Sequence, residues 1–269
     1  MGNSGQLKMK IYIKGTITSL TGLHIGGTNV GFAIGGADAT VVRNPWNQQP
    51  FIPGSSLKGK MRSLLERLEG KWSTSGITQS GPYIGDKEST SSSGKFICDI
   101  FGVTPENIKE NAKKKHGDYK PERDDMPISR IIVRDCELEP ESVEKLKKIK
   151  SDMPYTEVKT EVVIDRITAS ATPRQLERVP AGAVFNMRIV LNVFDGDDYT
   201  ELVNKIFEAL CLVQNDALGG KGSRGSGEVA IHVGSVRAKS KADFDANKDW
   251  QEFKIEIPPQ LRHEPSALA

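Results

Sequence analysis

Pro53-Gly54-Ser55-Ser56-Leu57-Lys58-Gly59-Lys60-Met61-Arg62 is the stretch that decides the fold, because it opens an amphipathic helix. Either Ser55 or Ser56 can cap the helix by accepting a bond from a free backbone N–H of its first turn. Lys58 and Arg62 are four residues apart and share one face. Apolar residues recur at helical spacing on another face and form a stripe for a core: Leu57, Met61, Leu64, Leu65 and Leu68.

This helix start predicts a phosphate-binding cradle. A helix N-terminus carries unpaired N–H groups and partial positive charge, and Lys58, Lys60 and Arg62 add cations to it. Gly54 to Lys60 spells G-x-x-x-x-G-K, but Met61 follows where a nucleotide-binding loop has Ser or Thr. No hydroxyl is therefore available for magnesium, and nucleotide hydrolysis is not expected. From these residues alone, a surface helix with solvated lysines is the alternative.

Composition sets the broad class. The chain has 269 residues, enough for one large domain with insertions or two small ones. Hydrophobic residues make up 37% and charged residues 27%, which is typical of a globular protein. The net charge of +2 is too small to indicate nucleic acid by itself, so a basic surface must come from local clustering.

Cysteine usage and hydropathy predict a cytoplasmic location and no membrane. Cys98, Cys136 and Cys211 are widely spaced and odd in number, which fits a reducing compartment without a disulfide framework. No apolar run is long enough to span a bilayer, and no signal-peptide pattern opens the chain.

A strand and a glycine-rich loop precede the helix. Met9, Ile11, Ile13 and Ile17 alternate with polar or basic residues and predict a strand that is apolar on one face. His24 then precedes a glycine pair, and Asp38 follows a second pair, Gly35-Gly36. Glycine-rich backbone allows a ligand to approach closely.

Residues 70–127 predict a large mobile insertion. Ser73 to Gly94 is rich in Ser, Thr and Gly, and Lys109 to Asp125 mixes charges, so neither part can bury much surface. Phe96 to Gly102 is a short apolar turn that can dock on the core. Beyond the insertion, Ile128 to Val133 predicts a buried strand and Pro140 to Ile149 a short helix.

Val158 to Ala181 predicts a projecting β-hairpin, with two extended arms flanking Thr168 to Pro173. An ordinary surface hairpin fits the pattern equally well. The tip is apolar and the edge is basic, with Lys159, Arg166, Arg174 and Arg178. A clean strand from Phe185 to Val193 and a helix with its buried face at Leu202, Ile206, Leu210 and Val213 follow.

The most unusual composition lies at Gly219 to Gly227, which holds five glycines, one lysine and one arginine. It follows a helix and precedes a strand at Val229 to Val233, the wrong order for a dinucleotide fingerprint. Such a loop can wrap backbone N–H groups around phosphates while Lys221 and Arg224 supply charge. A flexible linker is the alternative reading.

The order strand, helix, strand, strand, helix, glycine-rich loop, strand predicts an α+β protein. It fits a ferredoxin-like or RRM-like βαββαβ core that carries the insertion and a hairpin thumb. Five motifs resemble the RAMP superfamily and, more closely, the repeated backbone subunit of the type III-A CRISPR effector, the Csm complex. They are residues 23–27, 52–62, 164–168, 178–182 and 219–227. The resemblance covers most of the chain, apart from the insertion.

The resemblance implies a single domain over residues 7–269, with a lid-like insertion at 70–127 and a thumb hairpin at 154–181. Copies would stack head to tail with other Csm subunits along a crRNA, splay one base at regular intervals, and cleave the paired target RNA. Asp38 falls at the catalytic and metal-binding aspartate of the family, which needs Mg²⁺ or another divalent cation. The guide-contacting positions fall on His24, Ser55, Ser56, Lys58, Lys60, Arg62, Lys221, Ser223 and Arg224.

Residue chemistry agrees with these implied roles. A subunit that accepts any guide must grip the RNA backbone, which calls for Lys, Arg and free N–H groups rather than base readers. Aromatic residues make up only 6%, so an RRM-type stacking platform is not expected, and an apolar wedge fits better. Asp38 could hold magnesium together with water and phosphate. By itself, Asp38 could equally be a turn residue that bonds its own backbone.

Three other functions remain open. The chain could be a non-catalytic RNA-binding scaffold, or a metal-independent repeat-RNA processing endonuclease that uses His24 as its catalyst. A phosphate-binding metabolic enzyme is the third, although the missing Ser or Thr after Lys60 argues against it. Cys98, His116 and Cys136 lack paired ligand spacing, so buried thiols are expected rather than a zinc site.

Overall fold

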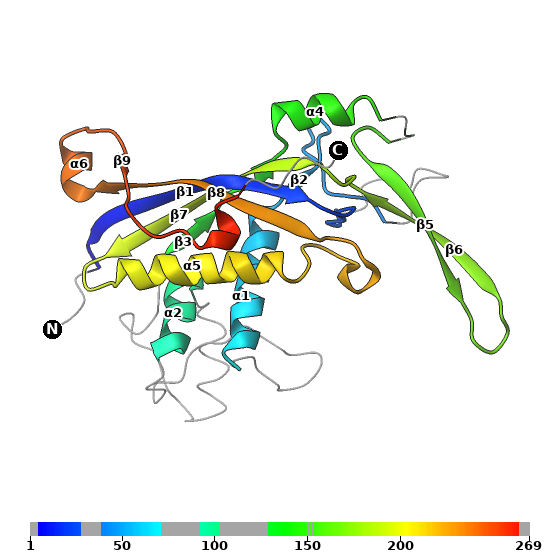
Figure 1. Cartoon of the computed structure of the whole chain (residues 1–269), viewed down its shortest axis with the longest axis horizontal. Coiled ribbons are helices and arrows are strands. Elements are labelled where there is room, and N and C mark those ends of the chain that lie inside the picture. The colour runs from blue at the N-terminus through cyan, green and yellow to red at the C-terminus, as the bar shows by residue number, and fades with distance from the viewer. Residues whose placement is uncertain are drawn as a thin grey trace.

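A five-stranded sheet runs through the molecule (Figure 1). In this computed structural model, residues 5–27, 39–70, 92–102, 129–149, 151 and 153–263 are described. The strand order is β3-β7-β1-β8-β9, and every neighbouring pair is antiparallel. The strands are β1 (Leu7–Ser19), β3 (Ile131–Val133), β7 (Val184–Phe194), β8 (Val229–Ser240) and β9 (Gln251–Glu252). The expected mixed α+β class is therefore confirmed.

Strand β1 is the middle strand of the sheet, and its buried apolar residues point to one face. Ile11, Ile13 and Ile17 are fully buried, whereas Lys14 between them is exposed. Ile11 lies opposite Leu191 of β7, and Ile13 lies opposite Ile189. Successive side chains of a strand point to opposite faces, so this register places apolar residues of both strands against the same core.

Three helices cover the apolar face of the sheet: α1 (Gly54–Leu68), α2 (Ser92–Phe101) and α5 (Tyr199–Gln214) (Figure 1). All four residues expected on the buried face of α5 are buried. Along α1 the apolar stripe is buried as far as Leu65, but Leu68 is 56% exposed because the helix ends there. Within the described part of the chain, no helix is both long enough and apolar enough to cross a membrane.

Two expectations about local structure were wrong. Residues 96–101 form the end of helix α2 rather than a turn, and Ile97 and Ile100 are buried in the core. Neither Ser55 nor Ser56 caps α1, because the helix already begins at Gly54, with Pro53 at the N-cap. The carboxylate of Asp135 instead accepts a hydrogen bond from the backbone N–H of Gly54 at 2.8 Å.

Strands β5 (Glu157–Ile164) and β6 (Ala171–Arg178) form a hairpin that projects from the sheet (Figure 1). Its turn spans residues 165–170, earlier than the expected 168–173. Asp165 sets this position, because its Oδ1 accepts hydrogen bonds from the backbone N–H groups of Ile167 and Thr168 at 2.9 and 2.8 Å. The small sheet β2 (Phe51–Ile52) with β4 (Cys136–Glu137) and helix α4 (Pro140–Leu146) complete this end of the fold.

Candidate nucleic-acid interface

Residues 22–25, which we call the central segment, lie between the base of the hairpin and the glycine-rich loop. On one side, Leu23 exchanges two backbone hydrogen bonds with Val179, both at 2.8 Å. On the other side, Gly220 N donates to His24 O at 2.8 Å, and Gly227 N donates to Gly22 O at 3.0 Å. Three motifs that are far apart in the sequence therefore meet here.

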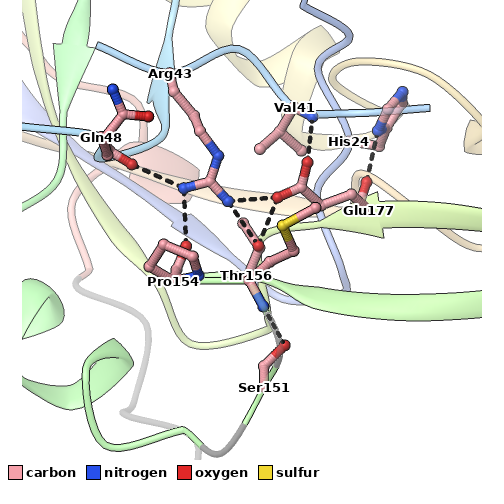
Figure 2. Close-up of polar contacts among 9 residues, drawn as sticks. His24, Val41, Arg43, Gln48, Ser151, Pro154, Thr156 and Glu177 are labelled. Carbon is pink, nitrogen blue, oxygen red and sulfur yellow. Dashed lines mark hydrogen bonds and ion pairs between the residues drawn. The ribbon is translucent and has the colours of Figure 1, made fainter. Parts of the chain in front are cut away.

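His24 is held in this segment with only 8% of its surface exposed. Its Nδ1 lies 2.7 Å from the backbone O of Glu177 (Figure 2). A carbonyl oxygen only accepts, so Nδ1 carries the hydrogen of this bond and Nε2 remains for another partner. The contact fixes the ring against the hairpin base, which favours a binding or positioning role over that of a freely accessible catalyst.

The Glu177 carboxylate forms a buried ion pair with Arg43 (Figure 2). The side chain of Glu177 is 1% exposed and that of Arg43 16%. Thr156 Oγ1 donates to Glu177 Oε1 at 2.6 Å, and Val41 N donates to Oε2 at 2.8 Å. Arg43 also donates to the backbone O of Pro154 and of Gln48, at 2.8 and 2.7 Å. Sequence patterns did not single out this pair, because each residue alone resembles a surface charge.

This ion pair lies next to Ala39, which directly follows Asp38 in the sequence. Asp38 itself is outside the described residues, and Ala39 is the first described residue after it. Glu177 N donates to Ala39 O at 3.0 Å, and Ala39 pairs with Leu176 in an isolated parallel bridge. Ala39 is therefore held at the base of the hairpin.

The glycine-rich loop requires glycine where it touches the central segment. Gly219 has φ +79°, and a Cβ built on it would lie 2.3 Å from His24 O. Side chains would therefore be excluded here by both conformation and space. Lys221, Ser223 and Arg224 are exposed on the loop, and Arg224 Nη1 lies 3.0 Å from Glu161 Oε2 on β5.

The cradle cations of α1 point in two directions. Lys60 points toward the segment that joins α5 to the glycine-rich loop, where its Nζ lies 3.3 Å from Asp216 Oδ2. Lys58 Nζ donates to Ser129 Oγ at 2.8 Å on the other side, and Arg62 donates to the backbone O of Gly102 at 2.7 Å. Burial, followed by the nearby charge of Arg62, lowers the pKa of Lys58.

Arg62 also pairs with Glu66 at 2.6 Å, and the side chains are 15% and 9% exposed. Lys60 and Asp216 are more exposed, at 25% and 42%. An exposed pair contributes about 0–1 kcal/mol, whereas removing one member of a buried pair costs about 3–5 kcal/mol. Lys60 can therefore exchange its partner for a phosphate at low cost, while Arg62 stabilises the fold.

The hairpin carries the expected cations and an apolar tip. Arg178 pairs with Glu157 at 2.6 Å, and Arg174 lies opposite Glu161 in the strand register. Lys159 shares this face, and Arg166 lies in the turn. The exposed apolar residues gather toward the tip: Val162, Val163, Ile164 and, at 95% exposure, Ile167.

The expected burial of two thiols is confirmed. Burial raises the pKa of Cys98 to about 11 and that of Cys136 to about 12. In the described ranges, no three His, Cys, Asp or Glu side chains are grouped so that they could hold a metal ion. His116 is not among the described residues.

Comparison with known proteins identifies the class. The RAMP superfamily model matches residues 16–230, and the chain therefore belongs to the RAMP superfamily. It is 37% identical over 256 residues to the CRISPR system Cms endoribonuclease Csm3 of Methanocaldococcus jannaschii, covering 93% of this chain and 90% of the relative. Within the superfamily, the chain is thus a homologue of the Csm3 endoribonucleases.

Solved structures agree with this assignment. A chain in the crystal structure of the Csm3–Csm4 subcomplex of the type III-A CRISPR-Cas interference complex is 26% identical, with a TM-score of 0.52. That match covers 94% of this chain and 92% of the other. Methanopyrus kandleri Csm3 has a TM-score of 0.54 at 18% identity, with coverage of 96% and 92%, and supports the fold alone.

Replacing Glu177 with Ala should lower the free energy of unfolding by about 3–5 kcal/mol, because it leaves Arg43 unpaired in a buried site. The matched control is Glu157→Ala, which removes the more exposed partner of Arg178 and should cost about 1 kcal/mol or less. Urea unfolding of both variants measures the difference. An equal loss of unfolding free energy in both variants would show that the Arg43–Glu177 pair stabilises the fold no more than an exposed ion pair does.

Gly219→Ala and Gly225→Ala separate backbone strain from steric conflict in the glycine-rich loop. Both glycines have positive φ, but a Cβ on Gly225 would meet nothing within 4 Å. Gly225→Ala should therefore cost only the left-handed strain of about 1–2 kcal/mol. Gly219→Ala should cost more and weaken RNA binding as well. Thermal unfolding and RNA titration test this, and equal effects would contradict the close approach to His24.

Proposed function

We propose that this Csm3 homologue is the repeated backbone subunit of a type III-A CRISPR complex, which binds crRNA and cleaves complementary target RNA at regular intervals. The observation that carries the proposal is the central segment. It joins His24, the glycine-rich loop, the hairpin base and residues 39–42 in one hydrogen-bonded unit.

Guide binding would use the phosphate backbone rather than the bases. Lys60 and Lys221 supply cations near the glycine-rich loop, and Ser223 and Arg224 extend this basic surface toward the hairpin. Ser55 and Ser56 lie in the first turn of α1 with no capping role, so their hydroxyls remain candidates for phosphate contacts. Lys58 and Arg62 support the cradle from the side of α2. Contacts of this kind bind every guide sequence with similar affinity.

The hairpin would act as the thumb. Its apolar tip is exposed and has the wedge chemistry that separates stacked bases. Lys159, Arg166, Arg174 and Arg178 would hold the RNA backbone beside it. The Arg43–Glu177 ion pair would keep the thumb in a constant orientation, so that successive subunits place their wedges at equal intervals.

We propose Asp38 as the catalytic residue and as the ligand of Mg²⁺ or another divalent cation. A carboxylate is the type of ligand that such hard cations prefer, and the bound cation supplies charge stabilisation at a phosphate. Ala39, fixed on the hairpin base, would hold the end of the catalytic loop close to the splayed base.

The fold and assembly follow the same proposal. The strand order β3-β7-β1-β8 with helices α1 and α5 on one face is that of a ferredoxin-like βαββαβ core. We propose one domain over residues 7–269, with residues 70–127 as an insertion and 154–181 as the thumb. Copies of the chain would stack along the guide together with other Csm subunits. Cys98, Cys136 and Cys211 form no disulfide with one another, which supports a reducing, cytoplasmic setting.

Lys60→Ala should lower RNA affinity and reduce the slope of log affinity against log salt concentration by about 0.7–0.9, the value of one phosphate contact. Arg62→Ala is the comparison. It should mainly lower stability, because Glu66 loses its partner in a buried site. Fluorescence anisotropy with labelled guide RNA at several salt concentrations measures both. A larger change of the salt slope in Arg62→Ala than in Lys60→Ala would show that Arg62, and not Lys60, contacts the phosphate.

Complexes assembled with Asp38→Ala should bind target RNA normally and lose the regular cuts. The measurement is cleavage of labelled target RNA in magnesium, with binding followed in parallel and with chelator added to one set. Asp249→Ala, an exposed aspartate outside the proposed interface, is the matched control and should cut normally. Persistent cuts in Asp38→Ala would make the subunit a scaffold. Cutting of precursor RNA that resists chelator and requires His24 would favour the processing endonuclease.

A further inference from the structure

The sheet face opposite the helices is strongly basic. Residues that lie directly opposite one another in the register share a face, so the exposed side of β1 can be followed onto its neighbours. Tyr12 pairs with Arg237 of β8. The cations of this open face are Lys10, Lys14, Arg188, Arg237 and Lys239, where Lys10 lies opposite Lys239 and Lys14 lies opposite Arg188.

These cations are not neutralised within the described part of the chain. None of the five forms an ion pair with a described carboxylate. The nearest acidic residue in the register is Glu252 of β9, which lies opposite Arg237. Asp243 also lies close enough to Lys239 to interact with its charge. Five cations against two carboxylates still leave a net positive surface that attracts an anionic partner.

Aromatic rings are interleaved with these cations. The Tyr12 and Trp250 ring centroids are 5.6 Å apart, and those of Trp250 and Phe244 are 6.3 Å apart. Lys14 Nζ lies 5.2 Å from the centroid of Tyr12, and Lys239 Nζ lies 4.7 Å from that of Phe244. The result is a continuous row of rings with a cation at each end. Two rings come from the segment between β8 and β9, which explains why overall aromatic content did not indicate them.

Two polar atoms on the same face lack partners. Arg188 Nε and Asn192 Oδ1 on β7 are inaccessible to solvent and have no hydrogen-bond partner in the structure. Buried polar atoms are normally satisfied. Because neither atom reaches solvent, the two add polarity beneath this face and are not part of its exposed surface. Asn192 lies opposite Lys10 in the register, and both atoms therefore belong to the basic face.

We propose that this open face is a second binding site for single-stranded RNA, separate from the guide-binding interface. Cations that hold phosphates and rings that stack on bases are the two components of such sites. An acidic protein would use the cations but would not need the row of rings. The site lies toward α6 (Lys241–Asp245) and β9, at the end of the sheet remote from the hairpin (Figure 1). It would hold RNA beyond the guide and its paired target, such as the unpaired part of a transcript.

The test uses guide-loaded complex, in which the first interface is filled, and a labelled oligouridylate of about 15 nucleotides that does not match the guide. Lys14→Glu/Arg237→Glu should lower its affinity about tenfold or more and reduce the salt slope. The matched control is Arg67→Glu/Lys148→Glu, which changes the net charge by the same amount at exposed positions elsewhere. Its affinity for the oligouridylate should stay within about twofold of that of the unmodified complex. Trp250→Leu should lower affinity about tenfold with the salt slope unchanged.

Three outcomes would overturn the proposal. One is equal weakening by both charge variants, which would mean non-specific attraction, and another is no weakening by either. The third is displacement of the RNA by polyglutamate as effectively as by unlabelled oligouridylate, which would make the face a site for acidic protein. Guide loading and target cleavage are measured in the same preparations and should be retained. Because the readout is binding of unmatched RNA, complexes that fail to cleave still report on this face.

Discussion

The Arg43–Glu177 ion pair is the interaction on which the arrangement of the interface depends. A buried carboxylate is tolerated only when its charge and its lone pairs are satisfied. Here Arg43, Thr156 and the backbone N–H of Val41 satisfy it together. Val41 and Arg43 belong to one segment and Thr156 to another, and Glu177 itself lies on β6. The condition for burying one charge therefore also sets where residues 39–43, the start of the first hairpin arm and the end of the second arm lie relative to one another.

Burial also separates the cations that support the fold from those that we propose as RNA contacts. Arg62 and Arg43 face carboxylates that are nearly inaccessible to water, whereas each pair of Lys60 and Arg224 has one well-exposed member, Asp216 at 42% and Arg224 itself at 55%. A solvent-exposed ion pair contributes little to stability, so it can be broken and remade with a phosphate. A surface that must release and accept RNA backbone is best built from cations of the second kind.

Much of the fold was predictable from periodicity. The alternation in β1 and β7 and the helical stripes of α1 and α5 are dictated by local geometry, and the expected strands and helices are confirmed. The start of α1 and the hairpin turn were misplaced because a distant carboxylate, Asp135, and a local one, Asp165, set them. The hydrogen bond from Gly54 to Asp135 spans 81 positions in the chain, so no local pattern could reveal it.

The sequence by itself determined the class of the protein, the identity of its elements and the motifs from which an RNA interface can be built, because these depend on residue type and spacing. Only the tertiary structure decided how the motifs are used. It placed the central segment between the hairpin base and the glycine-rich loop, and it paired Arg43 with Glu177, 134 positions away. The physical reason is that the cost of a charge depends on its burial and its partner, and both are properties of the folded chain.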